Sequence, residues 1–178
     1  MKKEITYNDL VAMNPCYTPD EIGITKGFKM PVVEFIKEYR DKVKSKYDII
    51  WVICRNDYMT DKDLRLFAVW CAREALKLVD NPDERSINAC DVAERYANGE
   101  ATDNELTAAW DAAWDAARDA ARAAARDAAR DAAWDAAMGA SWYAAWYAAR
   151  ASARAAARYA AWASAMGAQI DKLITYFK

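Results

Sequence analysis

A four-residue repeat runs from Trp110 to Gly167 and constrains the fold of this chain more than any other feature. Each unit has a large residue, a variable residue and then two residues that are nearly always Ala, and fifteen units follow one another without a change of register. Ala is the best helix former, and the other residue types of the repeat are tolerated in helices, so the run predicts helix. The large position holds, in order, Trp110, Trp114, Arg118, Arg122, Arg126, Arg130, Trp134, Met138, Trp142, Trp146, Arg150, Arg154, Arg158, Trp162 and Met166.

The period of the repeat does not match the period of a straight helix. Four residues at about 100° each advance about 400°, so the stripe of large residues drifts by roughly 40° per unit. No single flat partner can cover such a stripe, and the run must either supercoil in the right-handed sense or break. Gly139 is the expected break, because Gly costs about 1 kcal/mol relative to Ala inside a helix. We therefore expect helices near 103–138 and 141–167 in an antiparallel hairpin, with one continuous curved helix as the alternative.

The first hundred residues predict a series of short helices. We expect helices near 7–13 and 31–44, with an irregular segment rich in Pro and Gly between them. The β-branched run 48–54 fits a buried strand or a buried helix equally well, and we choose helix because no second clear strand could pair with it.

Capping signals mark three further helices. A helix should begin after Thr60 and end before Pro82, and another should begin after Pro82 and end at Gly99. Thr102 and Glu105 form a capping box that begins the repeat. The fold class is therefore all-α: a small N-terminal helical domain, 1–100, packed as one compact unit with an Ala-rich repeat region, 101–178, that is a long helix or a helical hairpin.

Composition excludes several kinds of chemistry. The chain of 178 residues has no His, five Gly and a net charge of −2. Without His, neither a Ser-His-Asp catalytic triad nor a Cys-His catalytic pair can form. The sequence also has no glycine-rich motif for binding phosphate. The four Cys lack the paired spacing of a zinc site and are expected to be buried, reduced thiols. We expect no enzyme activity, no metal and no cofactor. The cysteines are Cys16, Cys54, Cys71 and Cys90.

Charge divides the repeat into two halves. In the first half Asp115 with Arg118, Asp119 with Arg122, and Asp127 with Arg130 have the i,i+3 spacing of helical ion pairs. From 136 to 170 there is no acidic residue, so the arginines of the second half lack local partners. Arg beside Trp or Tyr can stack on a base and bind a phosphate, and the same residues dominate protein interfaces.

These residues of the second half are the candidate ligand-binding site. The alternative is structural: the aromatic side chains pack against residues 31–96, and the arginines pair with carboxylates there. The candidate site consists of Arg150, Arg154, Arg158, Trp142, Trp146, Tyr143, Tyr147, Tyr159 and Trp162. The alternative partners are Asp80, Asp83, Glu84, Asp91 and Glu94.

Residues 60–168 resemble a group of bacterial and phage proteins, some of which carry the label putative immunity protein. The most specific segment is Asp91-Val-Ala-Glu-Arg-Tyr-Ala-Asn-Gly-Glu-Ala-Thr102, and the stretch from Leu64 to Arg73 also contributes. The resemblance implies a setting of microbial conflict, in which small proteins neutralise a toxin or a defence signal. It brings no functional residues with it.

We expect a non-enzymatic binding protein that captures a small anionic, nucleotide-like ligand or a partner protein through its Arg and aromatic surface. Phage counter-defence by sequestration would suit that surface. A toxin-neutralising immunity protein and a helical module that forms homo-oligomers through its Ala rows are the alternatives.

The sequence also indicates where the protein acts. No apolar stretch could span a bilayer, and the N-terminus has no apolar signal region, so we expect the cytoplasm of a bacterium or of a phage-infected host. The drifting stripe argues against a membrane-surface helix. Six Asp residues interleaved with the first half of the repeat argue against nucleic acid.

Overall fold

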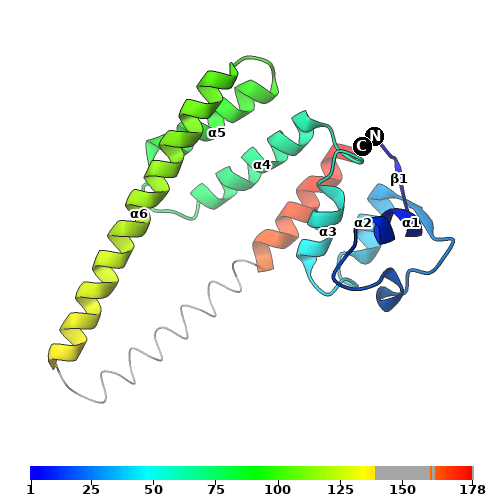
Figure 1. Ribbon diagram of the computed structural model, residues 1–178, viewed down its shortest axis with the longest axis horizontal. Coiled ribbons are helices and arrows are strands. Elements are labelled where there is room, and N and C mark those ends of the chain that lie inside the picture. Colours follow the sequence, from blue (N-terminus) through cyan, green and yellow to red (C-terminus); the bar gives the residue numbers. More distant parts are fainter. Residues whose placement is uncertain (139–160, 162, 178) are drawn as a thin grey trace. The chain divides into compact units, whose positions relative to one another are not determined.

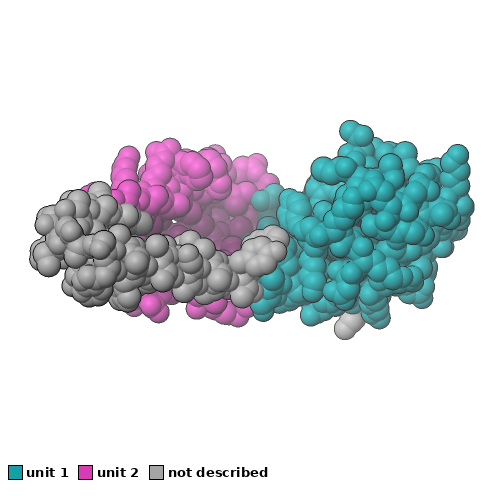
Figure 2. All heavy atoms as spheres, turned by 90° about the horizontal axis from the view of Figure 1, so that it is seen from below, with its two compact units in different colours: residues 1–71, 163–178 teal, residues 72–162 magenta. Residues whose placement is uncertain are grey.

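The computed structural model describes residues 1–138, 161 and 163–177. Helices dominate this part of the chain, which confirms the all-α fold class (Figure 1). The chain divides into two compact units, coloured teal and magenta in Figure 2. Unit 1 contains residues 1–71 and 163–178, and unit 2 contains residues 72–162. The last residues of the chain thus group with the first.

Unit 1 begins with a small antiparallel sheet. Strand β1, Glu4–Thr6, pairs with strand β2, Lys29–Pro31, and Ile5 lies opposite Met30. Helix α1, Tyr7–Ala12, follows β1 directly and is capped by Thr6. A 3-10 turn, η1, covers Pro19–Ile22. The sequence did not predict the sheet, because strands of three residues are too short to show an alternating pattern.

Helices α2, Val32–Tyr39, and α3, Lys46–Ile53, follow the sheet. The prediction of a helix for the run 48–54 is therefore confirmed. The prediction that the preceding helix extends to residue 44 is wrong: α2 ends at Tyr39 with Arg40 as its C-cap, and a turn leads to the capping residue Ser45. Ser45 and Asp48 then form a capping box that begins α3. That capping box is a signal in the sequence that the prediction overlooked.

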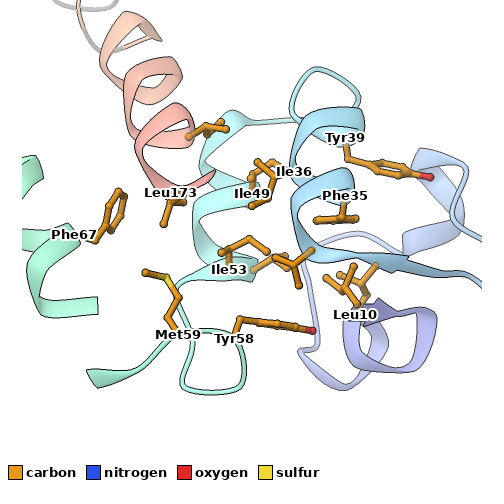
Figure 3. Packing of buried hydrophobic residues seen from close by; sticks show 14 of the residues in the cluster. Leu10, Phe35, Ile36, Tyr39, Ile49, Ile53, Tyr58, Met59, Phe67 and Leu173 are labelled. Carbon is orange, nitrogen blue, oxygen red and sulfur yellow. The ribbon is translucent and has the colours of Figure 1, made fainter. Parts of the chain in front are cut away.

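The hydrophobic core of unit 1 lies between α2, α3 and the C-terminal helix, residues 163–174 (Figure 3). Phe35 and Ile36 of α2 and Ile49 and Ile53 of α3 are fully buried. From the C-terminal helix, Met166, Ile170 and Leu173 point into the interior at i, i+4 and i+7 spacing, and a 3-10 turn, η2, Thr175–Phe177, closes the chain. This apolar face is why residues 163–178 complete unit 1.

Helix α4, Asp61–Leu76, begins at the predicted cap, where Thr60 Oγ1 accepts a hydrogen bond from Asp63 N. In unit 2, helix α5, Glu84–Ala97, is capped by Asp83 and is followed by Gly99 with a φ of 80°. Only glycine adopts that left-handed conformation without strain. The starts of α4 and α5 and the end of α5 confirm the signals read from the sequence. The end of α4 differs from the one expected at Asn81-Pro82: the helix ends at Leu76, after which Leu78 N–H and Val79 N–H bond only three residues back.

Helix α6, Asp103–Met138, spans 36 residues and confirms the first predicted helix of the repeat. Thr102 and Glu105 form its capping box, in which Thr102 N–H donates to Glu105 Oε2 over 2.8 Å. The break at Gly139 and the choice between a hairpin and a curved helix lie outside the described residues. So does the second helix, 141–167, except that residues 163–167 are helical.

The cysteines differ in exposure. All four are free thiols, and Cys90 is buried as expected, whereas Cys54 and Cys71 are half-buried and Cys16 is exposed. Burial raises the pKa of Cys54 to about 11, so this thiol is protonated at neutral pH and is a poor nucleophile. In the described ranges no helix is long and apolar enough to cross a membrane.

Candidate functional site

Helix α5 packs antiparallel to the first half of α6 in unit 2 (Figure 1). Ion pairs join the helices at both ends of the contact: Arg95 with Glu105 over 2.7 Å, and Arg85 with Asp119 over 3.1 Å. The buried side chains between these pairs are small, and they include Ala109 of α6. Small side chains let two helix backbones approach closely, which is the role that the sequence assigns to the Ala rows.

The buried row of α6 does not follow the four-residue repeat. Among the described side chains of α6, Ala109 and Ala116 are buried, and Ala112 and Ala113 between them are half-buried. A step of seven residues returns to nearly the same side of a helix, whereas two repeat units, eight residues, overshoot by about 80°. Ala116 is the third residue of its unit and Ala109 lies just before the first unit, so the row facing α5 has a spacing of seven residues and not eight.

The large residues of the same units lie away from α5 and remain exposed. The side chains of Trp110 and Trp114 are 62% and 51% exposed. Their rings are nearly parallel, at 10°, with centroids 6.0 Å apart, and the Arg118 guanidinium lies 5.6 Å from the Trp114 ring. We call Trp110, Trp114 and Arg118 the Trp ladder. It is a continuous stack of three large side chains on one exposed side of α6.

Charges around the Trp ladder are largely balanced within the helix. Asp115 pairs with Arg118 over 3.6 Å and Asp119 pairs with Arg122 over 3.9 Å, which confirms two of the three predicted i,i+3 pairs. The third pair, Asp127 with Arg130, is not tested, because the side chain of Asp127 lies outside the described ones. Exposed pairs of this kind contribute about 0.2 to 0.5 kcal/mol each. Arg118 and Arg122 are therefore not a free cationic surface for an anion.

None of the nine residues of the predicted ligand-binding site lies within the described residues. Three of the carboxylates named as their alternative partners are already bound to arginines of unit 2. Asp83 accepts two hydrogen bonds from the Arg85 guanidinium, and Arg73 of α4 pairs with Asp91 and Glu94 over 2.8 and 2.6 Å. The hydrogen bonds from Arg85 hold the pKa of Asp83 at about 2. The hydrogen bonds to Glu94 and Asp91 raise the pKa of Arg73.

The nine residues are Trp142, Tyr143, Trp146, Tyr147, Arg150, Arg154, Arg158, Tyr159 and Trp162.

Unit 1 contains a second candidate site that the sequence did not predict. A cavity of about 250 Å³ lies beside α3, and its lining is mainly apolar with Asp48 as its charged group. Tyr17 donates a hydrogen bond to Asp48 over 2.7 Å, and burial followed by this bond raises the Tyr17 pKa to about 12. Residues far apart in the chain form this cavity, so no local pattern could reveal it.

The Trp ladder, in contrast, left a signal in the sequence. Trp110 and Trp114 are four residues apart in a helix that begins with a capping box, so they had to share a side. For that half of the repeat we predicted only the i,i+3 ion pairs and no binding site. In the described ranges no group of three or more Cys, Asp or Glu side chains could hold a metal ion.

Comparisons of the chain with protein-family models, with curated proteins and with solved structures found no match.

Proposed function

We propose that this protein is a non-enzymatic binding protein that captures a partner protein through the Trp ladder of α6. One observation carries the proposal: two stacked tryptophans are more than half exposed on a helix whose other side is packed against α5. Large exposed aromatic side chains are costly in water and are enriched among the residues that dominate binding energy. Stacking also holds the rings in place, which lowers the entropy lost on binding.

The charges near the Trp ladder indicate the kind of partner. Asp111 and Asp115 alternate with the two tryptophans, and Arg118 is already paired. An anionic ligand would meet these carboxylates, whereas a basic protein surface would complement them. We therefore propose a partner with an apolar pocket rimmed by Lys or Arg. The resemblance to putative immunity proteins agrees with such a partner, a toxin of microbial conflict.

The proposal is tested with the double variant Trp110→Ala/Trp114→Ala and the control Arg126→Ala. Arg126 is an exposed large position of the same helix that lies outside the Trp ladder. Proteins captured from the source cells by the wild type are identified, purified and titrated against all three chains. We expect the double variant to bind at least tenfold more weakly, while the control binds as the wild type does. Equal binding by the double variant would refute the proposal.

A second candidate function is capture of an anionic, nucleotide-like ligand by Arg150, Arg154 and Arg158. The favouring observation is the absence of any acidic residue from 136 to 170 in the sequence. Calorimetry with a panel of mononucleotides and cyclic dinucleotides tests it, with Arg154→Glu as the variant. Binding that is lost in Arg154→Glu but kept in Trp110→Ala/Trp114→Ala would favour this second function. No heat with any nucleotide would eliminate it.

A further inference from the structure

The cavity in unit 1 lies between α3 and the irregular segment 14–22. About 250 Å³ is available in it, and a cavity of about 150 Å³ already holds a benzene molecule in a protein interior. The space therefore suits a single ring with a short chain. Much of the wall is apolar and is formed by Leu10, Pro15, Pro19, Ile22, Phe35 and Val43.

Asp48, in the first turn of α3, supplies the charged group of the wall. Its Oδ2 atom accepts hydrogen bonds from Tyr17 Oη over 2.7 Å and from Ser45 N over 3.0 Å. Both bonds fix the carboxylate in place. Its other oxygen, Oδ1, receives no hydrogen bond or ion pair from the residues that the structure describes. A fixed, half-buried carboxylate thus keeps one acceptor for a ligand.

Aromatic side chains line the same cavity as that carboxylate. Tyr17, Tyr47 and Trp51 all line the cavity. The ammonium of Lys44 lies 4.5 Å from the centre of the Tyr17 ring, so this aromatic wall already attracts one cation. Lys44 forms its ion pair with Glu21, over 2.6 Å, which leaves the charge of Asp48 for another cation.

We propose that this cavity binds a small organic ammonium ion with a compact aromatic or branched apolar body. The ammonium donates a hydrogen bond to Asp48 Oδ1 and lies near the aromatic rings, and the body fills the apolar end of the cavity. A neutral apolar ligand would bury Oδ1 without a donor, which costs free energy. An anion would be repelled by the same carboxylate. The site is independent of the Trp ladder, which belongs to unit 2.

Three probes of similar shape test the proposal on the full chain: phenethylamine, 2-phenylethanol and 3-phenylpropionate. Binding is measured by calorimetry and by shifts of the Trp51 indole signal in NMR spectra. We expect phenethylamine to bind at least tenfold more tightly than the alcohol, and the carboxylate to bind most weakly. Equal affinities for the three probes, or no shift at Trp51 with any of them, would overturn the proposal.

The variant Asp48→Asn removes the charge and keeps an oxygen that can accept the bonds from Tyr17 and Ser45. It should weaken phenethylamine binding by about ten- to a hundredfold, the range of a hydrogen bond to a charged group, and leave the alcohol unchanged. The matched control is Asp57→Asn, a 56% exposed carboxylate that does not line the cavity. Retained preference for phenethylamine in Asp48→Asn would refute the role of the carboxylate.

A filling variant keeps the proposal testable if Asp48→Asn does not fold. Val43 lines the cavity from the connection between α2 and α3 and is half-buried, so Val43→Phe can place a ring in the cavity from its edge. We expect this variant to lose binding of phenethylamine and of the alcohol together. Unchanged binding of both probes by folded Val43→Phe would place them elsewhere and overturn the proposal.

Discussion

Replacing Leu173 by Ala tests whether the end of the chain completes the core of unit 1. The Leu173 side chain is fully buried in the cluster that contains Ile49, Ile53 and Phe67 (Figure 3). Leu→Ala removes about three carbon groups from the interior at about 0.8 kcal/mol each, and the cavity left behind adds to that cost. We expect a loss of about 3 kcal/mol. For a domain of this size the midpoint of thermal unfolding should fall by about 12 to 24 °C.

The control for this prediction lies two residues away on the same helix. Asp171 is 65% exposed and pairs with Arg40 over 2.6 Å, so Asp171→Ala should cost less than about 1 kcal/mol. Hydrogen exchange of the α2 and α3 amides is the suitable assay, because it reports on unit 1 alone, whereas circular dichroism would be dominated by the Ala-rich helix. The reasoning fails if Leu173→Ala accelerates exchange no more than Asp171→Ala does.

Two further predictions concern tyrosines of unit 1. The Tyr58 hydroxyl is buried and has no hydrogen-bond partner among the described protein groups. Tyr58→Phe should therefore leave the free energy of unfolding, measured with urea, unchanged or raise it by up to about 1 kcal/mol. A loss of more than about 1 kcal/mol would reveal a partner. The Tyr17 pKa is raised from 10.0 to about 12, so the folded state holds its proton where the unfolded state has lost it. Its contribution to stability is complete below pH 10 and is lost as the pH rises from 10 to 12. The free energy of unfolding of Tyr17→Phe, measured by denaturation at each pH across this range, should fall less than that of the wild type. Identical pH profiles for the two proteins would contradict the assignment.

The sequence predicted best where one short signal decides the structure. The capping signals at Thr60, Asp83 and Thr102 placed the starts of α4, α5 and α6, and Gly99 marked the end of α5. Each signal depends only on a backbone group two to four residues away, so it works without knowledge of the rest of the fold.

Features that depend on residues far apart in the sequence could not be predicted, because no short local signal determines them. Strand β1 finds its partner more than twenty residues away, and the C-terminal helix joins a core formed by the first seventy residues. The spacing of Met166, Ile170 and Leu173 predicts one apolar face of a helix. It does not predict which other helices that face packs against. The cavity beside Asp48 needs three separate segments to form, and its shape depends on their packing.

The exposure of the Trp ladder follows from its place around α6: at about 100° per residue, Trp110 and Trp114 lie about 100° and 140° around the helix from the buried Ala109. A packed partner helix keeps to nearly the same side of α6 and so buries positions about seven residues apart, such as Ala109 and Ala116. A four-residue unit advances past that side by about 40° each time, so the large residues cannot all face one partner. Helix α5 packs against small residues of α6, and the large residues Trp110 and Trp114 are left exposed to solvent.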